Sequence, residues 1–233
     1  MTRLAPCLLL VCLMVGCAET SSAPAISPEA LRQRAAAFRS EGKSAEAEDL
    51  LSQAIRGQPT ATRDQRSAAA DLRRELASLR VAGDDLVGAE KLYREALTLL
   101  ETSPRGADAA IINLRTQLAG LCYRQSRFDE AADFYRTVLA LEASLLGETH
   151  PDPLGTMSIL GGLELKRGKF AEAETLFRRQ LRGVQQVHGP EKRETASVLD
   201  NLADVLETAG QAAAATRLRG EAARIRRKLC DEC

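Results

Sequence analysis

The sequence predicts an all-α protein, a solenoid of about five antiparallel helix hairpins. Aromatic residues make up 3% of the 233 residues and Trp is absent, whereas Ala, Leu, Glu and Arg dominate, a composition typical of helices. A short pattern around a central alanine returns five times along the sequence at a constant interval. A chain of this length can bury one continuous stack, so a second independent domain is not required.

Residues 1–16 have the organisation of a signal peptide. Arg3 gives a short basic start, and an apolar run follows from Leu4 to Val15. This run is too short to cross a bilayer as a helix. Residues 13–17, Leu-Met-Val-Gly-Cys, resemble the lipobox of bacterial lipoproteins, in which cleavage before the cysteine is coupled to its acylation.

This resemblance implies that Cys17 carries acyl chains of the palmitate type and tethers the protein to a membrane. Two or more chains are enough for stable anchoring. Residues 17–27 have no helical period and are predicted to be the lipidated cysteine with a flexible tether. Ala18 after the cysteine implies, by the same resemblance, the outer membrane facing the periplasm. The alternative is an ordinary secretory signal cut after Ala18 or Ala23.

Residues 28–233 contain the repeated pattern. The central alanines are evenly spaced at Ala47, Ala89, Ala131, Ala173 and Ala215. At a fixed distance before each of them lies a second small residue, at Ala35, Ala77, Ala119, Gly161 and Ala203. Small residues on facing helices allow two backbones to approach closely. Each unit is therefore predicted to be a pair of antiparallel helices.

Two further positions keep the same period. The predicted turn positions are Gly42, Asp84, Ser126, Gly168 and Gly210, and the hydrophobic anchors after the central alanines are Leu51, Tyr93, Tyr135 and Phe177. Arg219 interrupts the anchors in the fifth unit, and Arg34 stands in the first unit where later units have Leu. Terminal units of a solenoid need a polar outer face, so we expect these units to cap the stack.

Together these positions resemble the tetratricopeptide repeat over residues 28–229. The 42-residue period and the segment Leu146–Asp152 are similar to the longer repeats of kinesin light chains. The resemblance implies a right-handed superhelix whose concave wall is lined by the first helix of each unit and receives an extended peptide or a partner helix. Some family members clamp a C-terminal carboxylate with Lys and Asn, but Arg32 and Ala36 occupy those places here.

The concave wall that the resemblance implies supplies candidate partner-binding residues. They are Arg74, Asn113, Thr116, Tyr123, Arg124, Ser158, Lys166, Asp200 and Asn201. Their mixed polarity favours recognition of both the backbone and the side chains of a peptide.

The sequence does not indicate nucleic-acid binding, metal binding or catalysis. The 32 basic and 32 acidic side chains balance, which argues against a nucleic-acid surface. His150 and His188 are predicted to lie in loops without metal-ligand spacing, so no metal is predicted. No catalytic constellation, cofactor or small-molecule substrate is predicted either, and the protein is not expected to be an enzyme.

The cysteines beyond Cys17 leave alternatives open. Cys122 is predicted to lie in the core, and Cys230 with Cys233 is a candidate local disulfide or, alternatively, a thiol or metal site. The basic residues near the end are predicted to solvate a capping helix or, alternatively, to contact anionic lipids or an acidic partner; they are Arg217, Arg219, Arg224, Arg226, Arg227 and Lys228.

The functional expectation is a membrane-anchored scaffold for protein–protein interactions in the bacterial cell envelope. The alternative is an accessory lipoprotein for the assembly of outer-membrane proteins, pili or secretins.

Overall fold

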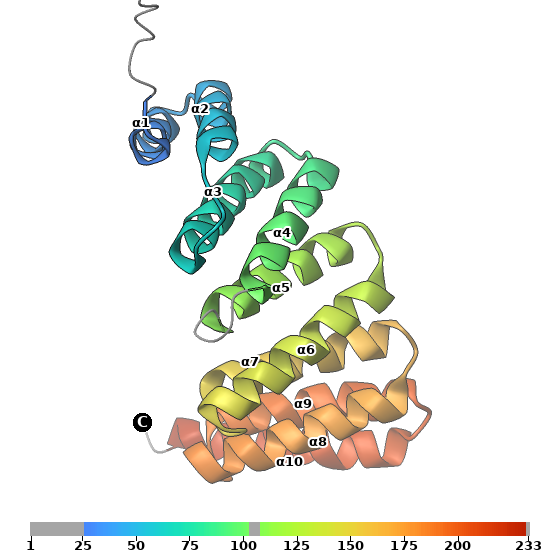
Figure 1. The fold of residues 1–233 in the computed structure, drawn as a ribbon. Coiled ribbons are helices and arrows are strands. Elements are labelled where there is room, and N and C mark those ends of the chain that lie inside the picture. Colours follow the sequence, from blue (N-terminus) through green and yellow to red (C-terminus); the bar gives the residue numbers. More distant parts are fainter. Residues whose placement is uncertain (1–25, 103–107, 232–233) are drawn as a thin grey trace, which may run out of the picture.

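A computed structural model describes residues 26–102 and 108–231, and these residues form ten α-helices in five consecutive hairpins without a strand (Figure 1). The hairpins are α1 (Pro28–Ser40) with α2 (Ser44–Gly57), α3 (Arg63–Ala82) with α4 (Leu86–Glu101), α5 (Asp108–Arg124) with α6 (Phe128–Leu146), α7 (Pro151–Lys166) with α8 (Phe170–His188), and α9 (Arg193–Thr208) with α10 (Ala212–Asp231). We call the first helix of each hairpin its A helix and the second its B helix. The predicted all-α solenoid is confirmed.

The N-terminal predictions fall largely outside the described residues. The predicted signal peptide, Cys17 and most of the tether belong to residues 1–25, and Cys233 is also outside. Helix α1 begins at Pro28, and the Ser27 hydroxyl caps it by accepting a hydrogen bond from the Ala30 amide at 3.2 Å. None of the described helices is both long enough and apolar enough to span a membrane.

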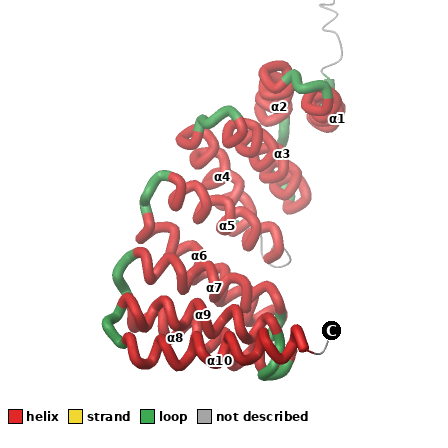
Figure 2. Tube along the Cα trace, turned by 180° about the vertical axis from the view of Figure 1, so that it is seen from behind, coloured by secondary structure: helices red, strands yellow, loops and turns green. Residues whose placement is uncertain are grey.

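The turns of the second to fifth hairpins follow one edge of the stack (Figure 2). All five predicted turn positions have a left-handed backbone, with φ of 76° at Gly42, 62° at Asp84, 60° at Ser126, 74° at Gly168 and 80° at Gly210. Glycine adopts this conformation without steric cost, and Asp tolerates it better than most residues. The repeat period therefore identified the residue at which each hairpin reverses.

The paired small residues lie buried between the two helices of each hairpin, as predicted. Gly161 shows why size matters there. A Cβ atom at this position would lie 2.8 Å from Cε2 of Phe177, closer than carbon atoms pack. The glycine in the fourth unit therefore makes room for the phenylalanine anchor of the same unit.

Arg219 and the two histidines can also be compared with their predicted positions. Arg219 lies at the surface, where it pairs with Asp204 at 2.7 Å and Glu207 at 2.5 Å on α9. His150 is the N-cap of α7 and accepts a hydrogen bond from the Asp152 amide. The prediction that His188 lies in a loop is wrong, because α8 continues through it; the first residue that cannot continue the helix is Gly189, with φ of 96°.

Candidate functional site

One face of α5 is turned toward α7 and lines two hollows. Ala109, Asn113, Thr116, Gly120 and Tyr123 are spaced by three or four residues, so their side chains share one face of the helix. The α5–α7 hollow has a volume of about 430 Å³ and is lined by Gly120, Tyr123, Tyr135, Ser158, Ile159, Gly162 and Leu163. The acidic hollow has the same volume and is lined by Ala109, Ile112, Asn113, Thr116, Glu142, Leu145, Leu146 and Asp152.

Five of the nine residues proposed from the sequence lie at these two hollows. Tyr123 and Ser158 line the α5–α7 hollow, and Asn113 and Thr116 line the acidic hollow. Lys166 adjoins the first hollow, because its Nζ lies 5.3 Å from the ring centroid of Tyr123. The structure thus brings part of the proposed set together on two neighbouring A helices.

The other four proposed residues lie elsewhere. Arg74 pairs with Asp71 at 3.2 Å on α3, and Arg124 pairs with Asp84 at 2.8 Å. Asp200 pairs with Arg226 of α10, and Asn201 is half-buried on α9. None of these four lines either hollow. The pairs of Arg124 and Asp200 join different elements of the stack, whereas the pair of Arg74 lies within α3.

The ammonium group of Lys166 lies against two aromatic rings. It is 5.2 Å from the ring centroid of Phe128, and the rings of Phe128 and Tyr123 meet edge to face with centroids 5.5 Å apart. Cation–π attraction holds the ammonium in place without neutralising its charge. In the part of the chain that the structure describes, no carboxylate forms an ion pair with Lys166.

Tyr135 reaches the α5–α7 hollow from α6, which the sequence reasoning missed because this residue was assigned only as an anchor. Burial raises the pKa of its phenol, so the hydroxyl keeps its proton at neutral pH. A difference between two successive units of the sequence could have revealed this role of Tyr135. Ser78 bonds the equivalent Tyr93 at 3.2 Å, whereas Gly120 takes the place of that serine in the next unit.

Glu142 is the second residue that the sequence did not reveal. It is 7% exposed, it bonds Thr156, and its Oε2 atom has no hydrogen-bond partner in the structure. Burial raises the pKa of this carboxyl, and Asp152 nearby adds to the effect. The acidic hollow therefore has a carboxyl group whose charged form is disfavoured.

A third hollow, of about 640 Å³, lies between the B helices α6 and α8. It is lined by Arg136, Leu139, Ala140, Leu160, Glu164, Ala171, Glu172, Thr175, Leu176 and Arg179. Its buried Glu164 is bonded by Arg136 and Arg167, so the charge is already compensated. The sequence reasoning considered only the A helices. The signal was the change from Phe134 to the smaller Leu176 at the equivalent position of the next unit.

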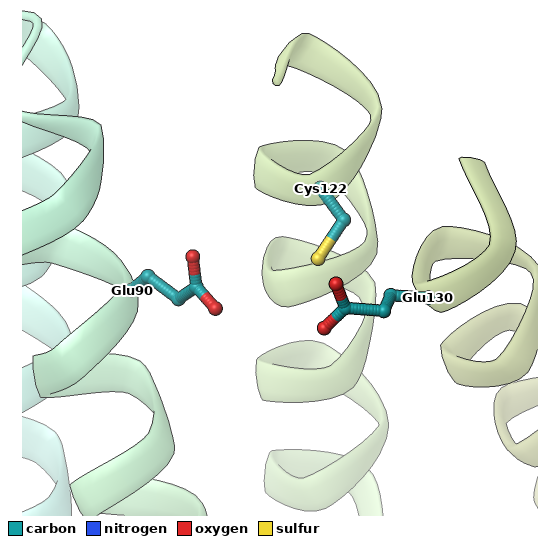
Figure 3. A group of neighbouring side chains, drawn as sticks. All are labelled: Glu90, Cys122 and Glu130. Atoms are coloured by element: carbon teal, nitrogen blue, oxygen red, sulfur yellow. The ribbon is translucent and has the colours of Figure 1, made fainter. Parts of the chain in front are cut away.

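One group of potential metal ligands joins three helices. Cys122 of α5 lies between Glu90 of α4 and Glu130 of α6, with their ligand atoms within 4.8 Å of one another (Figure 3). Arg127 bonds Glu90 at 2.6 Å and Glu130 at 2.5 Å, and burial raises the pKa of the Cys122 thiol. Arg94 also pairs with Glu90 at 2.8 Å and Glu130 at 3.3 Å, so two guanidinium groups balance the two carboxylates. The thiol is protonated at neutral pH, so the group favours a structural role.

Of the cysteines predicted beyond Cys17, the structure describes Cys122 and Cys230. Cys122 is fully buried, which confirms its assignment to the core. Cys230 is exposed near the end of α10, but Cys233 lies outside the described residues, so the disulfide between them stays a prediction. Two of the basic residues of α10, Arg224 and Lys228, pair with Glu191. These pairs favour the capping interpretation of the basic helix.

Comparisons with known proteins agree with this architecture. No curated protein gives a significant sequence match. Among solved structures, a putative kinesin light chain of Podospora anserina with nearly identical TPR-like repeats is 20% identical, with a TM-score of 0.69 over 86% of this chain and 95% of that one. BtubC (BKLC) from P. vanneervenii is 22% identical, with a TM-score of 0.63 over 86% of this chain and 80% of that one.

A third similar structure is YrrB, described as a TPR protein with an unusual peptide-binding site. It is 14% identical, with a TM-score of 0.56 over 84% of each chain. The family model of the tetratricopeptide repeat matches residues 108–179 and 152–228, which together make up more than half of the sequence. The chain therefore belongs to the tetratricopeptide repeat family.

Proposed function

We propose that this protein is a lipid-anchored, non-catalytic scaffold of the bacterial cell envelope, and that it binds an extended segment of a protein partner between α5 and α7. The tetratricopeptide fold is a scaffold for protein–protein interaction. The envelope location, the lipid anchor and the position of the binding face are the parts that we add to it.

The observation that carries the binding proposal is the pair of hollows along one face of α5. From Ala109 to Tyr123 the helix rises about 21 Å, which matches about six or seven residues of extended peptide. The two hollows have apolar walls with a few polar groups, such as Asn113 and Ser158. This combination is typical of sites where pockets take side chains and polar groups set the orientation. The described peptide-binding site of YrrB shows that the fold can serve this purpose.

The proposed anchor rests on the sequence around Cys17. The segment from Cys17 to Pro28, where α1 begins, can reach at most about 40 Å when fully extended. An acylated Cys17 would thus keep the stack close to the membrane surface. A partner in the same membrane, or one that arrives there, would meet the scaffold at a high local concentration.

Photo-crosslinking tests the binding face. A photoreactive phenylalanine analogue at Ser158 lies at the α5–α7 hollow, and the matched control at Ala140 lies at the hollow between α6 and α8. We expect a discrete protein adduct from intact membranes at position 158, with the crosslinked peptide mapping to one segment of the partner. Equal adducts at both positions, or an adduct only at position 140, would contradict the proposal.

Mass spectrometry of the mature N-terminus tests the anchor. We expect an acylated Cys17 as the first residue and membrane partition of the protein in detergent phase separation. The Cys17→Ser variant should lose both. A mature chain that begins at Glu19 or Pro24 without a lipid would support the ordinary secretory signal instead.

A further inference from the structure

Tyr135 differs from its counterpart in the preceding unit in what its hydroxyl can bond. The hydroxyl of Tyr93 lies 3.2 Å from Oγ of Ser78 across the hairpin. Gly120 replaces that serine in the next unit, and no hydrogen bond of the Tyr135 hydroxyl is found within the described residues. Tyr135 instead lines the α5–α7 hollow, so its phenol is a polar group without a protein partner at a cavity wall.

The rest of the hollow is suited to an apolar group. Gly120 and Gly162 occupy the same position in successive units, and a Cβ atom added to either would meet nothing within 4 Å. Ile159, which is 50% exposed, and Leu163 give the hollow aliphatic walls. Open space beside exposed aliphatic carbon favours the burial of an apolar side chain from a ligand, because this removes both surfaces from water.

The charge beside the hollow specifies a second part of the ligand. Lys166 is held over the rings of Tyr123 and Phe128 and forms no ion pair among the described residues. The two other cations proposed for the concave wall, Arg74 and Arg124, are already paired with Asp71 and Asp84. Lys166 therefore offers an uncompensated positive charge next to an apolar hollow, and the complementary group is a carboxylate.

We infer that the α5–α7 hollow is a specificity subsite for an extended protein segment that carries a bulky apolar residue beside an acidic one. The apolar side chain fills the space over Gly120 and Gly162, the Tyr135 hydroxyl bonds a carbonyl of the ligand backbone, and Lys166 pairs with the acidic side chain. This inference rests on the proposed function and goes beyond it by naming the chemistry of the segment.

A displayed library of random heptapeptides tests the inference on the protein without its signal peptide and tether. Peptides selected on the wild-type chain should be enriched in an apolar residue next to Asp or Glu. Selection on Lys166→Glu should replace the acidic residue by Lys or Arg. Enrichment of peptides that lack the apolar–acidic pair, or identical peptides from both chains, would overturn the inference while leaving peptide binding intact.

Two substitutions then test peptide binding at this hollow separately from the stability of the fold. For the best selected peptide, Tyr135→Phe should weaken binding by about 2- to 10-fold, the usual effect of losing one hydrogen bond. Gly120→Ser should raise the melting temperature, because it restores the bond that Ser78 makes with Tyr93 and improves helix propensity, yet it should weaken binding at least as much. Full binding by Gly120→Ser would overturn the role of this hollow.

Ser78→Gly is the matched control, because it removes the equivalent hydroxyl outside the hollow. It should lower the melting temperature and leave peptide affinity unchanged. Failure to select any peptide would contradict the inference, and the crosslink at position 158 then decides separately whether this face binds a protein at all.

Discussion

Two junctions of the stack use the same backbone arrangement with different chemistry. Between the second and third units, Arg127 ties Glu90 of α4 to Glu130 of α6 beside the buried Cys122. Two units later in the sequence, the positions of Cys122, Arg127 and Glu130 are occupied by Leu206, Gln211 and Ala214. There α8, α9 and α10 meet through an apolar cluster that includes Phe177, Val205 and Leu206.

This difference teaches that the repeat period fixes where units touch and leaves the type of contact free. The apolar junction is stabilised by burial of carbon surface, which does not depend on pH. The polar junction depends on an ionised Glu90, whose pKa is lowered to about 2, mainly by its hydrogen bond with Arg127. The two junctions should therefore respond differently to acid.

The largest expected effect is at the apolar junction. Leu206→Ala leaves a cavity beside Phe177 and should lower the free energy of unfolding by about 2–5 kcal/mol. Denaturant unfolding should show the same loss at pH 4 and pH 7, with hydrogen exchange of α9 and α10 affected most. Val87→Ala at a 76% exposed position is the control and should change little. A loss that varies with pH would show that this junction is not purely apolar.

Crowding of Phe177 from within its own hairpin should have the next largest effect. Gly161→Ala places a Cβ 2.8 Å from the Phe177 ring and should cost about 1–3 kcal/mol. Its neighbour offers a matched control, because Gly162→Ala enters open space in the same helix and should stabilise the fold by about 1 kcal/mol. Thermal unfolding of the two variants should therefore shift in opposite directions, and equal shifts would contradict the close packing of Gly161.

At the polar junction, Glu90→Gln should lower the free energy of unfolding by about 1–2 kcal/mol at pH 7. The native carboxyl has a pKa of about 2, below its ordinary value of 4.5, so its stabilising contribution is present above pH 4.5 and declines as the pH falls toward 2. The difference between wild type and variant should shrink over that range. A constant difference from pH 7 to pH 2 would exclude the ionised pair as its source.

The smallest expected effect has the opposite sign. Burial raises the pKa of Glu142, so the folded state holds its proton more tightly than the unfolded chain does. Its stability contribution is therefore complete below the unfolded pKa and is lost as the pH rises through the folded pKa. Glu142→Gln should remove this loss and stabilise the protein at pH 7 by on the order of 1 kcal/mol. Urea unfolding at pH 7 measures this difference. Equal stability of the variant and the wild type would show that the carboxylate is solvated.

The sequence predicted the fold well because its main constraints are local and periodic. Turns need a left-handed residue and close helices need a small one, so Gly42, Gly168 and the central alanines reveal the hairpins without a structure. Terminal positions such as Arg219 were also recognisable, since an arginine in place of an aromatic anchor marks a surface. These features depend only on spacing along the chain.

The site was harder to predict because it depends on partners that are distant in sequence. Asp200 looks free in the sequence, yet it pairs with Arg226. Tyr135 looks like a core anchor, yet it lines a hollow together with Gly120 from across the hairpin. The hollow between α6 and α8 is lined by Leu176 where the preceding unit has Phe134, and a motif search that rewards similarity does not detect such a difference. Differences between aligned repeats carried the missing information.

The common left-handed turn allows such a chain to lengthen by duplication of its repeats. Every described hairpin reverses at the same repeat position with a left-handed residue, so each repeat block pairs its two helices through the same kind of turn. Duplication of one block in frame would add a hairpin without reshaping the others. Recognition could then diverge in the new copy through single exchanges, such as serine for glycine opposite a tyrosine, while the architecture stayed intact.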